Sequence, residues 1–366
     1  MALKPAFVTE VQEAVRAHAK LLPRGGGTKT ALSTPRAEQT VLDMTGLSGM
    51  LEYDPGEFVF VAQAGTPVAE VEKLLGQHGQ YLPFDPPFVE AGATLGGTVA
   101  AGLSGPLRQR YGGVRDFILG VKFVDGQGNL IKGGGKVVKN AAGFDTPKLM
   151  VGSLGRLGIL TELAFKVFPF PKATATLKVT FGSLEAALEA LYKLAVSQFE
   201  FYALDLEAHP ATLTLRLGGL SEALPVRLER LLGFLGNPAE DRRLVLEGEP
   251  ERGYWRGVNR LEFGEGYLVK IPIQPKKILA LETALSTQAR CYLSAGNLLY
   301  LNWLEPIAEL DSLLKTQGLS GLVLRGSTSH DVTSLESPFI GVNLEQAFGN
   351  RVTAALDPSR RFSPEP

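Results

Sequence analysis

The chain has little cysteine and almost no net charge. One of its 366 residues is cysteine, Cys291, so an internal disulfide is excluded, and so is an iron–sulfur cluster held by four thiolates of this chain alone. Electron transfer through such a cluster would therefore need a partner protein. The formal net charge of -1 also gives no reason to expect a nucleic acid partner or binding to an anionic membrane surface.

Long apolar runs are missing as well. No stretch approaches the roughly 18 to 20 uninterrupted apolar residues of a membrane span, and the first residues, "MALKPAFVTEVQEAV", lack the apolar segment of a signal peptide. We therefore expect no transmembrane segment and a cytoplasmic location, with membrane association arising only through partner subunits.

Glycine, in contrast, is abundant and unevenly spread. It crowds into three clusters: "RGGG" (24–27), "EAGATLGGTVAAGLSGP" (90–106) and "VGSLGRLGI" (151–159). The first is not an ATPase phosphate-binding loop, because Thr28 stands where a glycine must precede the lysine and Pro35 interrupts the helix that should follow. The third is not a Rossmann fingerprint, because its spacing is G-x-x-G-x-x-G and its strand comes after it.

The three clusters still favour ligand binding on physical grounds. Successive glycines can adopt positive φ and gather backbone N–H groups into an anion-binding concavity. Small residues also let the backbone approach a ligand closely, whereas a packed core would need bulk at these places. One extended ligand with central phosphates and flat rings at its ends, such as a flavin dinucleotide, could contact all three clusters. The alternative is three unrelated loops.

The first 170 residues or so predict short strands, turns and one clear helix. That helix follows "FVFVAQAG", with Thr66 as its cap and Pro67 in its first turn. A hairpin is predicted over 116–134 with its turn at Gln127 and Gly128, and a strand within 158–171.

From Ala173 onward the pattern repeats, and each half has the order βαββαβ of a ferredoxin-like unit. Two such units would place eight strands side by side or face to face, with four helices covering one layer. The first half comprises 175–181, 183–197, 201–207, 211–217, 223–236 and 242–248; the second comprises 267–273, 275–287, 289–295, 298–304, 306–316 and 320–326.

These segments resemble a known family. "PRGGGTK", "GATLGGTVAAGLSGP" and "RDFILGVKFVDGQGNLIKGGGKVVKNAAGFDTPKLMVGSLGRLGILTEL" resemble the PCMH-type FAD domain of the vanillyl-alcohol oxidase superfamily, and with "LDPSRRF" they are most similar to the FAD-binding subunits of glycolate oxidases. The resemblance implies an α+β fold: a PCMH-type FAD-binding domain (1–172), a duplicated ferredoxin-like cap or substrate domain (173–328), and a C-terminal segment (329–366) that returns to the FAD domain.

The resemblance also implies which residues bind FAD, mostly through their backbone. The first cluster would bind the pyrophosphate, the second would run along the phosphates and the inner edge of the flavin with its last glycines near the ring, and the third would line the adenosine or pyrophosphate side. These residues are Arg24, Gly25, Gly26, Gly27 and Thr28; Ala93, Thr94, Gly96, Gly97, Thr98, Gly102 and Gly105; and Gly152, Ser153, Gly155, Gly158 and Ile159.

Two departures from the family's patterns concern how FAD is held. Some members bond flavin covalently through a histidine after the first glycines or a cysteine in the second loop; Thr28 fills the first place and no cysteine fills the second. The resemblance therefore implies non-covalent FAD. The closing motif usually reads D-P-x-x-x-F-N-P-G, but Ser363 replaces its asparagine here and the glycine is missing, which leaves a flavin contact from the tail doubtful.

The catalytic residues stay unknown at this stage. Oxidation of a 2-hydroxy acid needs a cation for the carboxylate and a base for the hydroxyl proton. Each of the four histidines, His18, His78, His209 and His330, is expected to be structural or solvated. Arg325 with His330 is a weak candidate pair. Arg110, Tyr111 and Arg115 either face the flavin or, as we slightly prefer, form salt bridges.

No histidine pairing with metal-ligand spacing occurs, so no metal site is expected. The resemblance then implies a subunit that is catalytically incomplete alone and oxidises glycolate together with a larger catalytic flavoprotein subunit and an iron–sulfur subunit. Two alternatives remain: an autonomous FAD-dependent oxidoreductase acting on another 2-hydroxy acid or alcohol, and a non-catalytic scaffold with a decayed FAD site.

Overall fold

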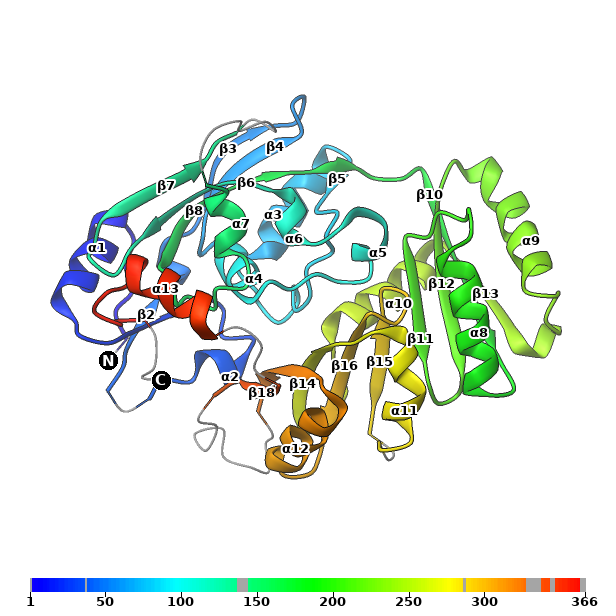
Figure 1. The fold of residues 1–366 in the computed structure, drawn as a ribbon. Helices are drawn as coiled ribbons and strands as arrows, with labels where there is room; N and C mark the ends of the chain where they lie inside the picture. The colour runs from blue at the N-terminus through cyan, green and yellow to red at the C-terminus, as the bar shows by residue number, and fades with distance from the viewer. Residues whose placement is uncertain are drawn as a thin grey trace. The chain divides into compact units, whose positions relative to one another are not determined.

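The computed structural model describes residues 2–36, 38–136, 144–285, 288–326, 337–342 and 346–362. The chain divides into two compact units, and each has its own sheet (Figure 1). Unit 1 comprises residues 1–105, 112–170 and 345–366, and unit 2 comprises residues 106–111 and 171–344. Within the described residues, no helix has both the length and the apolar character that crossing a membrane requires.

Unit 1 contains a five-stranded antiparallel sheet with the order β3-β4-β8-β6-β7. The predicted hairpin is β6 with β7, and its turn is closed by the Asp125 carboxylate, which accepts hydrogen bonds from the backbone N–H of Gln127 and Asn129. The predicted strand in 158–171 is β8, the central strand. The sheet and its helices are β3 (Met50–Asp54), β4 (Val59–Gln63), α3 (Val68–Gln77), α6 (Val114–Phe117), β6 (Ile118–Val124), β7 (Leu130–Gly134), α7 (Thr146–Met150) and β8 (Ile159–Lys166).

A second layer of unit 1 holds the first glycine cluster. Strand β1 pairs in parallel with β2, and β5 pairs with β9. Helix α1 packs Val11 and Val15 into the same core as Leu21 of β1 and Ile159 of β8. The elements outside the five-stranded sheet are α1 (Val8–Ala17), β1 (Leu21–Arg24), α2 (Thr30–Ser33), β2 (Thr40–Asp43), η1 (Met44–Gly46), β5 (Gln80–Tyr81), α4 (Leu95–Ala101), β9 (Phe168–Pro169) and α13 (Gln346–Leu356).

The C-terminal residues that follow α13 fold against this layer. The backbone N–H of Leu21 donates to the carbonyl of Arg361 at 2.8 Å, and that of Gly126 donates to the carbonyl of Leu356 at 2.8 Å. Asp357, fully buried, accepts from the N–H groups of Arg361 and Phe362. The ring of Phe362 is buried in the α1–β1 core. The chain end therefore braces the strand that leads into the first glycine cluster.

The predicted cap of α3 was wrong. Pro67 is the N-cap residue and the helix begins at Val68. The Thr66 hydroxyl donates to the carbonyl of Gln63 at 2.7 Å and accepts from the N–H of Gly49. It therefore links the end of β4 to the residue before β3 and does not cap the helix. Val68, Val71 and Leu75 are buried, as the apolar face of the helix predicts.

Unit 2 contains a nine-stranded sheet within the described residues, with the order β13-β10-β12-β11-β15-β16-β14-β17-β18 (Figure 1). The two βαββαβ runs lie side by side and meet where Leu206 of β11 pairs with Tyr292 of β15. The first run is β10 (Ala173–Thr180), α8 (Leu184–Ala195), β11 (Ala203–Glu207), β12 (Thr212–Gly219), α9 (Leu224–Phe234) and β13 (Arg243–Glu247). The second is β14 (Tyr267–Pro272), α11 (Ile278–Glu282), β15 (Arg290–Leu293), β16 (Leu298–Trp303), α12 (Ile307–Gln317) and β17 (Ser320–Arg325).

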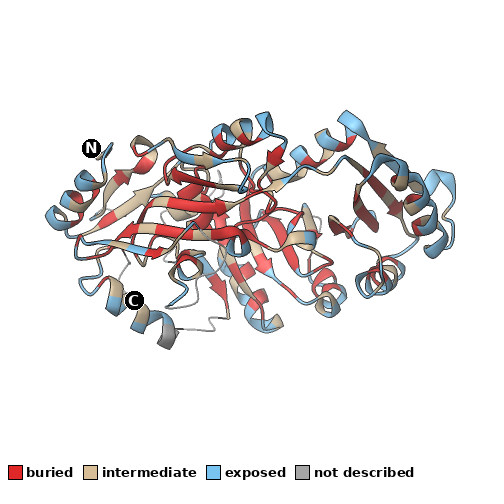
Figure 2. Ribbon diagram, turned by 90° about the horizontal axis from the view of Figure 1, so that it is seen from above, coloured by how far each residue is buried: buried red, intermediate tan, exposed pale blue. Residues whose placement is uncertain are grey.

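Several further elements of unit 2 were not predicted. They are α5 (Arg108–Tyr111), η2 (Ser221–Ala223), η3 (Glu240–Arg242), α10 (Gly248–Arg260), η4 (Pro275–Lys277) and β18 (Phe339–Gly341). The helix predicted over 275–287 was too long, because α11 ends at Glu282. In Figure 2 the strands of the sheets are mostly buried, whereas the surrounding helices expose one side.

Helix α10 is attached to the sheet by a buried ion pair. The fully buried Glu251 carboxylate accepts from Arg216 Nε at 2.7 Å and from the hydroxyls of Thr174 and Thr176 at 2.9 and 3.2 Å. Trp255, one turn later, donates its indole N–H to the Thr176 hydroxyl. These polar residues of β10 and β12 therefore define the face of the sheet that α10 covers.

We expect Glu251→Ala to destabilise unit 2 by about 3–5 kcal/mol, because it leaves the Arg216 guanidinium without its buried counter-ion. The measurement is urea unfolding followed by tryptophan fluorescence, which reports on this unit because Trp255 and Trp303 are the only tryptophans of the chain. Glu249→Ala is the matched control on the same helix, since Glu249 forms exposed ion pairs with Arg252 and Arg256 and its loss should change little. Equal losses in the two variants would contradict the assignment.

Candidate flavin-binding site

The first two glycine clusters lie in direct contact within unit 1. A Cβ added at Gly25 would lie 2.2 Å from Thr94 Oγ1, and one at Gly26 would lie 1.8 Å from the carbonyl oxygen of Gly92. Gly27 has a φ of +67° and open space where a side chain would be. Close approach therefore requires glycine at two of these positions, and backbone conformation favours it at the third.

The second cluster forms helix α4 beside the strand layer. Thr94 is its N-cap and accepts a hydrogen bond from the N–H of Gly97 at 3.2 Å, and Gly102 ends the helix in the left-handed conformation. A Cβ on Gly96 would lie 2.9 Å from both the Cβ and the carbonyl oxygen of Ala64, so the bare backbone of the helix packs on the residue that follows β4.

The third cluster is bonded to α4. The N–H of Gly152 donates to the carbonyl of Val99 at 2.9 Å, and the N–H of Leu154 donates to the carbonyl of Ala100 at 2.8 Å. A Cβ on Gly155 would lie 2.9 Å from Pro23 Cγ, next to the first cluster. The three clusters, spread over about 135 residues of sequence, therefore meet at one place.

A cavity of about 730 Å³, counting the part open to solvent, lies between the three clusters. Ten of the predicted cofactor residues line it: Gly25, Gly26, Gly27, Thr28, Thr94, Gly96, Gly97, Gly155, Gly158 and Ile159. Its other lining residues are Pro23, Lys29, Leu32, Ser33, Met44, Ala64, Ala100, Ala101, Leu154 and Leu160. The walls thus combine bare backbone with apolar side chains.

The remaining predicted residues lie around this cavity and do not line it. Arg24 lines an adjoining hollow with the first glycines, and Ala93 and Thr98 are buried. Gly105 donates its N–H to the carbonyl of Phe84. Gly102 and Gly152 set the backbone where α4 meets the third cluster. The Ser153 hydroxyl is buried and has no hydrogen-bond partner among the described residues.

Lys29 is a lining residue that the sequence analysis missed. Its side chain is 8% exposed, and its ammonium contacts the Thr28 hydroxyl at 2.9 Å and lies 5.6 Å from the ring centre of Phe88. Burial alone lowers the pKa of Lys29 from 10.5 to about 8. Only the residue type, a lysine two residues after a glycine run, could have suggested it.

Unit 2 holds most of the side chains considered for catalysis. Arg110 forms a 3.0 Å ion pair with Glu200, and the Tyr111 ring packs edge-on against Tyr202, in line with the preferred structural interpretation. Arg325 donates to the carbonyl of Leu261 at 2.6 Å, whereas His330 lies outside the described residues, so this pair stays a prediction. Arg115 is an exposed residue of α6 in unit 1.

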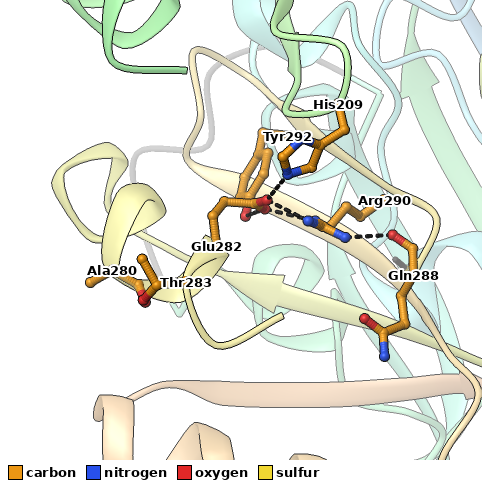
Figure 3. Close-up of polar contacts among 7 residues, drawn as sticks. All are labelled: His209, Ala280, Glu282, Thr283, Gln288, Arg290 and Tyr292. Atoms are coloured by element: carbon orange, nitrogen blue, oxygen red, sulfur yellow. Dashed lines mark hydrogen bonds and ion pairs between the residues drawn. The ribbon is translucent and has the colours of Figure 1, made fainter. Parts of the chain in front are cut away.

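The other histidines have mainly structural partners. His18 ends α1 and contacts the carbonyl of Ala14, and His78 ends α3 beside Tyr53. His209 is 72% exposed, and its Nε2 lies 3.3 Å from a carboxylate oxygen of Glu282. Figure 3 shows His209, Arg290 and Tyr292 converging on this carboxylate, a contact that the sequence did not predict.

Comparison with known proteins assigns a cofactor to unit 1. Residues 2–134 match the family model described as an FAD binding domain. FAD is the cofactor that this match indicates. The chain is also 42% identical, over 184 residues, to the glycolate oxidase subunit GlcE of Escherichia coli, a match that covers 50% of this chain and 52% of that protein.

Two further relatives match over a similar share of the chain. The glycolate oxidase subunit GlcD of Bacillus subtilis is 31% identical over 172 residues, covering 47% of this chain and 36% of that protein. The D-lactate dehydrogenase of Archaeoglobus fulgidus is 29% identical over 197 residues, covering 53% and 44%. The chain therefore spans from about a third to half the length of these curated relatives.

A solved structure of alkyldihydroxyacetonephosphate synthase has the same fold over almost the whole chain. It aligns with a TM-score of 0.72 and 17% sequence identity, covering 99% of this chain and 75% of that chain. This similarity establishes the α+β fold alone.

Three observations of the structure indicate that the residues at and around the cavity suit FAD. Lys29, a lining residue that is 8% exposed, has no carboxylate contact among the described residues. The Ser153 hydroxyl is an unsatisfied polar group in the third cluster. Apolar side chains such as Leu32, Met44 and Ile159 supply surface for a flat ring. A dinucleotide has the phosphates, the hydrogen-bonding groups and the rings that these features complement.

We expect Gly26→Ala to reduce FAD retention strongly and to destabilise unit 1 by about 1–3 kcal/mol, because the new Cβ would overlap backbone atoms of Gly92. Flavin absorbance per protein after desalting is the measurement. Gly76→Ala is the matched control, since that helical position has open space and should keep both FAD and stability. A Gly26→Ala protein that stays fully loaded would refute the packing argument.

The buried ammonium predicts a stability change in FAD-free protein. The folded state holds Lys29 at a pKa of about 8, below its ordinary 10.5, so it binds fewer protons than the unfolded chain between these values and stability should rise with pH there. Below pH 8 the buried ammonium destabilises the folded state by its full desolvation cost. Lys29→Met should therefore be more stable than wild type by roughly 3 kcal/mol.

Differential scanning calorimetry of FAD-free protein from pH 7 to 10 tests this, and the advantage of Lys29→Met should shrink as the pH rises. Lys122→Met is the control: it removes a 2.9 Å ion pair with Glu162 in the central sheet and should give no stabilisation at any pH. If Lys29→Met were destabilising at pH 7, the ammonium would not carry the cost inferred here.

Proposed function

We propose that this chain is the FAD-binding subunit of a glycolate oxidase type of 2-hydroxy acid dehydrogenase. It would hold FAD non-covalently in the unit 1 cavity and assist the oxidation of glycolate to glyoxylate together with partner subunits. The observation that carries the proposal is the meeting of three glycine clusters around one cavity, in a chain that is 42% identical over 184 residues to a glycolate oxidase subunit.

The residues of this chain would have three tasks. Bare backbone at Gly25, Gly26 and Gly27 offers N–H groups to the phosphates, as expected for successive glycines in a concave turn. Leu32 and Met44 exclude water from one wall. Thr28 supplies no nucleophile of the kind that bonds flavin covalently, which supports reversible binding. Bound FAD would supply an acceptor for the two electrons removed from a hydroxy acid.

Partner subunits enter the proposal for chemical reasons. Cys291, the only cysteine, cannot build an iron–sulfur cluster, so electrons leaving FAD would need an iron–sulfur partner subunit. The cation and base that a 2-hydroxy acid needs are assigned to a larger catalytic flavoprotein subunit. Unit 2, with its two βαββαβ runs, would act as a duplicated ferredoxin-like cap domain, and the assembly would be cytoplasmic.

The test combines copurification with a flavin spectrum. Purification from the native cell should recover one FAD per chain and the two partner subunits, and acid should release the FAD intact. Anaerobic glycolate should bleach the flavin of the assembly but leave that of the isolated chain unchanged.

Each alternative has a distinct outcome in the same experiment. Bleaching of the isolated chain by glycolate or by another 2-hydroxy acid would favour an autonomous oxidoreductase. Absence of flavin, with no gain in melting temperature on adding FAD, would favour a scaffold with a decayed site. As a matched variant, an assembly carrying Gly26→Ala should lose this FAD, and unchanged glycolate oxidation would show that turnover does not use it.

A further inference from the structure

Lys29 is a buried charge for which the described part of the chain provides no counter-ion. Its contacts within the described residues are one hydroxyl and one aromatic ring. Neither neutralises an ammonium, and the desolvation of an unpaired charge is costly. A fold can retain an unpaired buried charge when a bound ligand offsets the desolvation cost.

The surroundings of Lys29 favour an anion. Among the described residues that line the cavity, Lys29 is the only charged one. The charged groups on the neighbouring segments are Arg24 at the end of β1, Asp43 at the end of β2, Arg36 after α2 and Arg156 in the third cluster. Asp43 is engaged elsewhere, since it pairs with Lys4 at 3.8 Å and accepts from Thr45.

The two arginines strengthen this positive character. Burial, and next the positive charge of Arg36, lower the pKa of Arg156, so these two guanidinium groups lie near one another beside the third cluster. An anionic ligand in the cavity would therefore meet Lys29 in the lining, with Arg156 on the adjoining third cluster.

We propose that Lys29 binds the pyrophosphate of FAD through its ammonium, and that this contact makes cofactor affinity depend on the protonation of this one lysine. The pyrophosphate is the anionic part of the dinucleotide, and Lys29 lies two residues after the glycine cluster whose backbone suits phosphates. The inference rests on the proposed binding of FAD in the cavity and adds a side chain and a pH dependence to it.

The sign of the pH dependence follows from linkage. In the FAD-free protein burial holds the pKa of Lys29 at about 8, and a pyrophosphate beside the ammonium raises it. Below pH 8 the lysine is charged in both states and the dissociation constant is constant. Above pH 8 binding takes up a proton, so the dissociation constant rises by up to tenfold per pH unit until the pKa of the complex is reached.

The experiment is calorimetric titration of FAD-free full-length protein with FAD at pH 6.5, 7.5, 8.5 and 9.5, in two buffers of different ionisation enthalpy. For wild type we expect no proton uptake at pH 6.5 and up to one proton per FAD near pH 9. Lys29→Met should bind FAD about 10–100-fold more weakly at pH 7 and show neither proton uptake nor the rise above pH 8.

Lys270→Met is the matched control. Lys270 lies on β14 of unit 2, and burial also lowers its pKa to about 8, but it does not line the cavity. This variant should keep the wild-type affinity and pH profile. Lys29→Gln provides a second neutral side chain and should behave like Lys29→Met, and the melting temperature of each variant checks that it folds.

Ligand fragments separate the pyrophosphate from the flavin ring. ADP carries the pyrophosphate without a flavin, and riboflavin carries the ring without phosphate. The loss in Lys29→Met should appear with ADP and be absent with riboflavin; the reverse pattern would overturn the pyrophosphate assignment. If wild type and Lys29→Met bind FAD equally across the pH range, the inference fails while the proposed function stands. If wild type binds no FAD, the proposed function fails first.

Discussion

The candidate site depends on backbone-to-backbone contact at places where side chains are missing. Gly26 lies so close to the carbonyl of Gly92, and Gly96 so close to Ala64, that any side chain there would force the loops apart. These contacts hold the cavity walls in place without filling the cavity. A site built in this way is rigid before its ligand arrives, which lowers the entropy lost on binding.

The rest of unit 1 fixes the segments that carry these contacts. Strand β1 delivers the first cluster, and it is held on one side by β2 and by the C-terminal residues on the other, through the Leu21–Arg361 hydrogen bond. Strand β8 begins at Ile159, directly after the third cluster, and runs through the centre of the five-stranded sheet. The first and third clusters are therefore short connections, from β1 to α2 and from α7 to β8, and packed strands fix one end of each glycine-rich segment.

The sequence predicted the features that depend on local chemistry. Clustered glycines indicated close backbone approach, and alternating apolar strands with helices of 3.6-residue period indicated two βαββαβ runs. It missed features that depend on tertiary partners. Helix α10, "GEPERGYWRGVNR", is held by an ion pair of Glu251 and an indole hydrogen bond of Trp255, whose partners on other strands the local sequence does not reveal. From the sequence alone, the Thr66 hydroxyl could either cap α3 or bond to backbone on its other side. Its contact with Gly49 in the folded chain decides for the second.

Buried charged side chains have different roles in the two units. In unit 2 the Glu251 carboxylate is matched by Arg216, and the Glu282 carboxylate by Arg290 and the Tyr292 hydroxyl, so each cluster is complete within the chain. Such clusters hold elements together and leave little charge for a ligand. Lys29 in unit 1 is buried to a similar degree, yet a hydroxyl and a ring are its contacts among the described residues. Because a fold gains nothing from an unmatched buried ammonium, its counter-ion should come from outside the chain, and the cavity it lines is where that anion can enter.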